Sequence, residues 1–113
     1  MQMMDFNAID KPTWPLKLKD DEQTVVHLSY PTLEMVERLE AMTPALNKAA
    51  KTKDGNTIRA VFTFLAEVMS CNDDGFIFTA EELRDKYRMT LLDAFRFVAG
   101  YSDFLKEAND AKN

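Results

Sequence analysis

The sequence predicts a mainly helical fold, a small helical bundle with an N-terminal β-hairpin packed against it. Several segments after residue 32 repeat apolar residues at the spacing of three and four that marks one face of a helix. One earlier stretch, from Leu16 to Leu28, alternates apolar and polar residues around a charged turn, which is typical of two short strands. Because a two-stranded hairpin is only marginally stable alone, we expect the helices to support it.

The length and composition indicate a single domain. The chain has 113 residues, of which 46% are hydrophobic, enough for one modest core. We expect a leader arm over residues 1–15, one α-rich domain over residues 16–106 and a polar tail over residues 107–113. Pro12 and Pro15 exclude a continuous helix from the arm, and Trp14 is expected to tack the arm onto the domain.

Capping residues and proline place the first helices. Thr32 can accept a hydrogen bond from a backbone N–H of the first turn, so a helix is predicted from there to Met42. Pro44 lacks a backbone N–H, and we expect it to end this helix and to begin a short second one that reaches Ala50. A strongly apolar helix over residues 57–70 is predicted to form the centre of the core.

Two further helices follow a glycine-containing turn. Thr79 and Glu82 form a capping box, in which each side chain can accept a hydrogen bond from the backbone N–H of the other residue. A short helix is therefore predicted over residues 80–87. The last helix is predicted over residues 91–106.

This last helix has more apolar surface than one packed face requires. Its apolar residues cover roughly two-thirds of the circumference, whereas a helix on the surface of a small domain needs an arc of about 100°. The core-facing set is predicted to include Leu91, Phe95, Val98 and Leu105. We expect the surplus residues to lie on a flank that binds a partner or a second copy of the chain. These partner-binding residues are Phe97, Tyr101 and Phe104.

Gly100 lies in the middle of the same helix, where glycine costs about 1 kcal/mol relative to alanine. Two interpretations stay open. The glycine either permits the close approach of another backbone or is a tolerated surface residue.

The composition argues against several functional classes. A net charge of −5 does not suit nucleic-acid binding, which needs a clustered basic surface. The sequence has no signal peptide and no apolar run long enough to span a membrane, so a cytoplasmic location is expected. The single histidine, His27, has no metal-ligand partner at a suitable spacing, and Cys71 reads as a small buried hydrophobe. No catalytic motif is present, so we expect neither enzymatic activity nor a cofactor.

The stretch from Ser70 to Glu81 partly follows the EF-hand pattern. With Gly75 at the sixth position, Ser70, Asn72, Asp74 and Glu81 take ligand positions of a calcium loop. The first ligand is then a neutral hydroxyl where a carboxylate is expected, which disfavours calcium binding. A calcium-responsive module stays open as an alternative function.

The order of these pieces resembles the small tail assembly chaperones of long-tailed bacteriophages and prophages. The resemblance runs from about Leu16 to Leu105, through the hairpin, the segment 29–34, the turn 72–75, the segment 78–83 and the closing segment 92–98. It implies a non-enzymatic protein that binds the phage tape measure protein and the tail tube protein in the cytoplasm of the bacterial host. A small regulatory protein that binds one enzyme is a further alternative.

Overall fold

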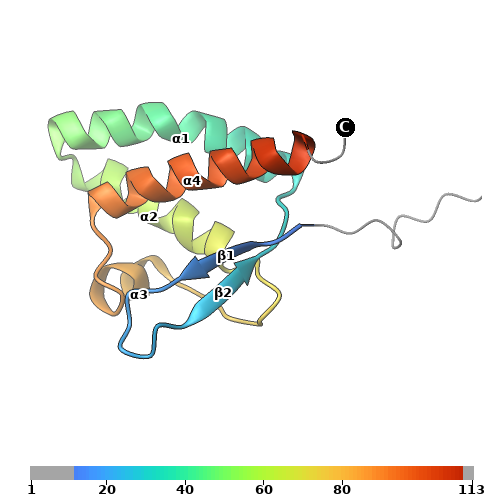
Figure 1. Ribbon diagram of the computed structural model, residues 1–113. Coiled ribbons are helices and arrows are strands. Elements are labelled where there is room, and N and C mark those ends of the chain that lie inside the picture. Colours follow the sequence, from blue (N-terminus) through green and yellow to red (C-terminus); the bar gives the residue numbers. More distant parts are fainter. Residues whose placement is uncertain (1–11, 111–113) are drawn as a thin grey trace, which may run out of the picture.

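The computed structural model describes residues 12–110 and confirms the mainly helical fold with its N-terminal hairpin (Figure 1). Helices α1 and α4 lie side by side, α2 packs beneath them, and the hairpin and α3 occupy the opposite side of the molecule. The core is continuous and contains residues from the hairpin and from all four helices. The elements are β1 (Trp14–Lys17), β2 (Val25–Leu28), α1 (Leu33–Thr52), α2 (Gly55–Met69), α3 (Ala80–Asp85) and α4 (Leu91–Asp110).

The hairpin is antiparallel and places one face on the core. Trp14 pairs with Leu28 and Lys17 pairs with Val25, so the first strand begins inside the segment that the sequence assigned to the leader arm. The Asp20 carboxylate closes the turn, because it accepts hydrogen bonds from the Thr24 backbone N–H at 2.8 Å and from the Thr24 hydroxyl at 2.6 Å. Residues 1–11 of the predicted arm lie outside the described residues.

Helix α1 is continuous through Pro44, so the predicted break is wrong. Thr32 caps its N-terminus as predicted, by accepting a hydrogen bond from the Met35 N–H at 3.3 Å. Pro44 lies on the exposed side of the helix, whereas Leu39, Leu46 and Ala49 are buried on the other side. The apolar face is uninterrupted across the proline, and its burial offsets the lost hydrogen bond.

Helix α2 begins two residues earlier than predicted. The Asp54 side chain caps it, because it accepts hydrogen bonds from the Asn56 N–H at 3.1 Å and from the Thr57 hydroxyl at 3.0 Å. Gly55 is therefore the first helical residue and does not belong to a loop. The buried residues of α2 form the centre of the core, as predicted: Val61, Phe62, Phe64, Leu65, Ala66, Val68 and Met69.

The capping box before α3 is half formed. Thr79 accepts a hydrogen bond from the Glu82 N–H at 3.1 Å, but the Glu82 carboxylate contacts the Thr79 hydroxyl, at 3.2 Å, in place of the backbone N–H. Helix α4 continues to Asp110, so residues 107–110 of the predicted polar tail are helical. The helix thus continues past Phe104, the last buried residue among those of α4 whose side chains are described.

Candidate interaction surfaces

Three aromatic rings of α4 pack against a tryptophan of the hairpin. The Trp14 ring centroid lies 5.5 Å from that of Phe97, 5.6 Å from that of Tyr101 and 6.2 Å from that of Phe104. These distances fall within the range of favourable aromatic pairs. The Tyr30 ring adds an edge contact to Phe104 at 6.2 Å. We call Trp14, Phe97, Tyr101 and Phe104 the aromatic cluster.

The three α4 rings are therefore not an open flank. Phe97 is 5% exposed, Tyr101 1% and Phe104 8%, and burial raises the pKa of the Tyr101 hydroxyl above its usual value. The prediction that they lie on an exposed surface is wrong. One intramolecular surface does cover them, because the chain supplies a second layer in the form of β1 and its tryptophan.

Gly100 makes room for this layer. A Cβ atom at Gly100 would lie 2.9 Å from Cζ2 of Trp14 and 3.2 Å from Cη2, closer than side chains pack. The glycine thus permits a close approach, as one interpretation proposed, but its neighbour is an indole ring and not another backbone.

Because the aromatic face points into the core, a different part of α4 faces outward. Leu91 and Phe95 are only half buried, Ala99 is exposed, and Leu92 is 65% exposed. At about 100° per residue, these four side chains share an arc of roughly 100°. We call them the α4 flank. Of the residues predicted to face the core, Val98 is buried, while Leu105 is half buried like Leu91 and Phe95.

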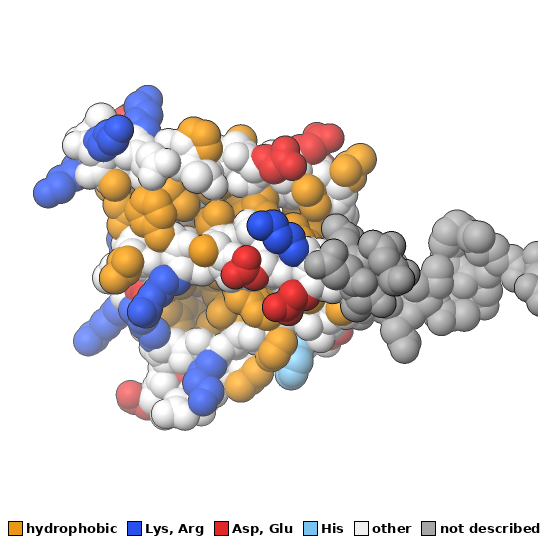
Figure 2. All heavy atoms as spheres, turned by 45° about the horizontal axis from the view of Figure 1, so that its top comes forward, with side chains coloured by type: hydrophobic (Ala, Val, Ile, Leu, Met, Phe, Trp, Pro, Cys, Tyr) orange, Lys and Arg blue, Asp and Glu red, His pale blue; other side chains and the backbone are white. Residues whose placement is uncertain are grey.

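Apolar side chains are visible on both sides of α4 in Figure 2. They gather in a band between α1 and α4 and in a second band between α4 and the hairpin. The charged side chains of this face lie mainly around these bands. The molecule therefore presents two separate apolar regions along one helix.

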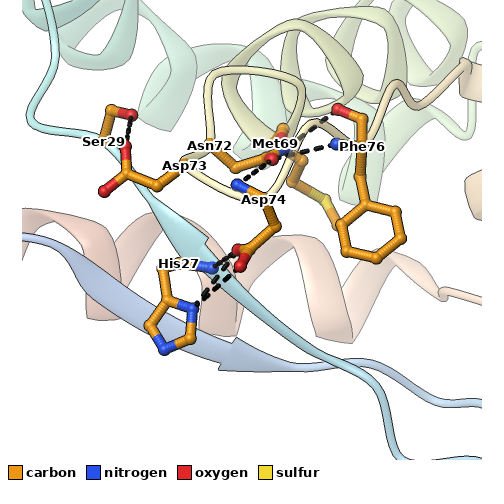
Figure 3. A network of polar contacts seen from close by, with 7 residues as sticks. All are labelled: His27, Ser29, Met69, Asn72, Asp73, Asp74 and Phe76. Carbon is orange, nitrogen blue, oxygen red and sulfur yellow. Dashed lines mark hydrogen bonds and ion pairs between the residues drawn. The ribbon is translucent and has the colours of Figure 1, made fainter.

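The loop that partly follows the EF-hand pattern is organised by a single amide side chain (Figure 3). The Asn72 amide nitrogen donates to the carbonyl oxygens of Met69 and Phe76, both at 2.8 Å. Its amide oxygen accepts from the backbone N–H groups of Asp74 and Phe76, both at 3.0 Å. Both ends of the amide are thus used to hold the turn.

The same loop is fastened to the outer edge of β2. The Asp74 carboxylate accepts a hydrogen bond from the His27 backbone N–H at 2.7 Å and lies 3.2 Å from the His27 ring nitrogen Nδ1 (Figure 3). The Asp73 N–H donates to the His27 carbonyl at 3.0 Å, and Ser29 donates its hydroxyl to Asp73 at 3.1 Å. The hydrogen bond from the His27 N–H lowers the pKa of Asp74 below its ordinary value.

These contacts explain why the loop does not have the form of a metal site. The Ser70 hydroxyl accepts a hydrogen bond from the Phe78 N–H at 2.9 Å, and the oxygens of Asn72 and Asp74 also accept backbone N–H groups. Three of the four candidate ligands are thus aimed at separate N–H groups, whereas a calcium ion requires its oxygens to converge. Among residues 12–110, no three acidic, histidine or cysteine side chains are grouped as metal ligands.

Cys71 is exposed, so the prediction of a buried side chain is wrong. It lies beyond the end of α2, where its backbone carbonyl accepts a hydrogen bond from the Ser29 N–H at 2.9 Å. The backbone hydrogen bond, and not a contact of the side chain, holds this residue in place.

Across the part of the chain that the structure describes, no helix is long and apolar enough to cross a membrane.

Comparison with known proteins leaves the resemblance to tail assembly chaperones as a hypothesis. No family model, no curated protein and no solved structure matches the chain.

Proposed function

We propose that this chain is a non-enzymatic tail assembly chaperone of a long-tailed phage or prophage. In this role it binds the tape measure protein and the tail tube protein in the cytoplasm of the host. The observation that supports a binding role is the α4 flank, where the apolar side chain of Leu92 is 65% exposed. The order of segments along the sequence is what favours this family of partners.

The flank has the chemistry that an apolar helical partner requires. Leu91, Leu92 and Phe95 offer aliphatic and aromatic surface on a helix, and removal of such apolar surface from water favours protein association. The net charge of −5 favours solubility while the flank is unoccupied. A tape measure protein is long and largely helical, so several copies of the chaperone could bind along it.

Pull-down from cells that co-express a tape measure protein encoded in the same genome tests this proposal. We expect Leu92→Glu to reduce capture at least about tenfold, because a carboxylate would be buried without a partner. Ile77→Glu is the matched control, since Ile77 is 74% exposed but lies in the loop before α3. The proposal fails if Leu92→Glu binds as well as the unmodified chain, or if Ile77→Glu reduces capture to the same extent.

The gene neighbourhood separates this function from the regulatory alternative. A chaperone gene is expected beside a tail tube gene and a very long gene for a helical protein. If the chain instead captures one host enzyme through the same flank, the regulatory function is correct. Sedimentation of the purified chain and of Leu92→Glu shows whether self-association uses this surface.

A further inference from the structure

A cavity of about 330 Å³ lies between β1, the segment that precedes α4, and the first turns of α4. It occupies the second apolar band of Figure 2, on the opposite side of α4 from α1. Its volume is at the lower end for small-ligand pockets and suits one or two apolar side chains. Its apolar lining comes from Trp14, Leu16, Leu18, Tyr87, Met89 and Phe97.

The outer edge of β1 borders this cavity. The sheet has two strands, so β2 covers only one edge of β1. Leu18 donates its N–H to the Thr24 carbonyl at 2.8 Å, and alternation along an antiparallel pair then directs the backbone of Lys17 and Pro15 away from β2. Pro15 has no N–H to leave unsatisfied there, which is the usual place for proline in an edge strand.

The two outer edges of the hairpin differ in whether another segment covers them. The loop after α2 covers β2, through the hydrogen bonds from Ser29 to Cys71 and from Asp73 to His27. No segment within residues 12–110 pairs with the outer edge of β1. The edge of β1 therefore resembles the open strand to which other proteins add an extended peptide.

The rim of the cavity is basic, in contrast to the chain as a whole. Lys17, Lys19 and Arg96 lie around it together with one acidic residue, Asp93. Lys19 forms an ion pair with Asp93, whereas Lys17 and Arg96 are exposed and form no ion pair with another described residue. Two positive charges are thus available beside the cavity in a protein whose net charge is −5.

We propose that the edge of β1 and this cavity together bind an extended peptide that is both apolar and acidic. The peptide pairs with the backbone of Pro15 and Lys17, one of its apolar side chains enters the cavity, and its carboxylates meet Lys17 and Arg96. This surface is distinct from the α4 flank. The inference stands whether or not the chain acts in tail assembly.

Titration of the isotope-labelled chain with a short peptide of alternating leucine and glutamate tests the proposal by nuclear magnetic resonance. The amide signals of Lys17 and Phe97 should shift, because one lies on the strand edge and the other on the cavity wall. A peptide of alternating leucine and lysine should bind about tenfold more weakly, since it repels the rim. The double variant Lys17→Glu/Arg96→Glu should lose the preference for the acidic peptide.

The matched control is Lys51→Glu/Lys106→Glu, which makes the same change in net charge at two exposed residues that do not line the cavity. It should keep at least half of the affinity for the acidic peptide. Equal binding of the two peptides, equal loss in both double variants, or shifts confined to the α4 flank would each overturn the proposal. Leu92→Glu should leave this titration unchanged, so the result does not depend on the proposed chaperone function.

Discussion

The indole ring of Trp14 packs directly against Gly100, because Cζ2 of the ring lies 2.9 Å from the position that a Cβ atom would take at Gly100. The missing side chain lets the first strand lie close against the last helix. The indole packs against the rings of Phe97, Tyr101 and Phe104, so moving it aside disturbs these three contacts.

Gly100→Ala should therefore lower stability. Forcing a methyl group into a packed site costs about 1 to 3 kcal/mol, and the better helix propensity of alanine returns about 1 kcal/mol. We expect a net loss of about 1 kcal/mol in urea denaturation, with a shift of tryptophan fluorescence, since Trp14 is the only tryptophan. In the control Gly55→Ala, an added Cβ meets nothing within 4 Å, and stability should hold or rise.

Truncation of Phe97 should destabilise the protein more than truncation of Phe95. The sequence predicts the opposite, because it assigns Phe95 to the core and Phe97 to a partner-binding flank. Phe97 is 5% exposed within the aromatic cluster, so Phe97→Ala should cost about 3 to 5 kcal/mol. Phe95 is half buried on the α4 flank, and its truncation should cost only about 1 to 2 kcal/mol. Thermal melting of both variants measures this; a larger loss for Phe95→Ala would mean that α4 is rotated relative to the structure.

Pro44→Ala should stabilise the protein. Alanine restores a backbone N–H in the middle of α1 and removes the clash of the proline ring with the preceding turn. Proline also restricts the unfolded chain, which offsets part of the gain, so we expect about 1 to 2 kcal/mol in denaturant unfolding. A loss of stability would indicate that α1 needs a bend at this position.

Acid should loosen the attachment of the loop to β2. The hydrogen bond from the His27 N–H lowers the pKa of Asp74 in the folded protein below the unfolded value of about 3.9. A lowered folded pKa stabilises the native state above the unfolded pKa, and this contribution is lost as the pH falls through the folded pKa. Urea midpoints measured between pH 7 and pH 2.5 should fall below about pH 4, and less steeply in Asp74→Asn.

Much of the fold follows from local signals that the sequence carries. The hairpin alternation, the caps at Thr32 and Thr79, and the apolar face of α2 each depend on neighbouring residues, and the structure has all of them. Pro44 and Gly55 were misread because local preference was opposed there by burial in one case and by the Asp54 cap in the other. Tertiary packing decides the conformation at Pro44, and a single sequence does not display it, whereas the Asp54 cap is a local signal that the sequence carries.

The orientation of α4 was harder to predict. With apolar residues around most of its circumference, periodicity alone could not tell which side would be covered by β1 and which by solvent. One signal was available: Trp14 lies at the start of an alternating segment, and Gly100 offers a gap between Phe97 and Phe104 on the helix. A prediction that Trp14 packs against Gly100 would have placed β1 on this face of α4.

The aromatic cluster also sets the order in which segments of the chain can reach their final packing. The ribosome makes β1 first and α4 last, yet Trp14 depends on Phe97, Tyr101 and Phe104 for its packing. A hairpin of two strands has little stability without support, so the earliest segment must wait for the latest one before it is fixed. A nascent chain halted before α4 would therefore leave Trp14 without the three rings against which it packs.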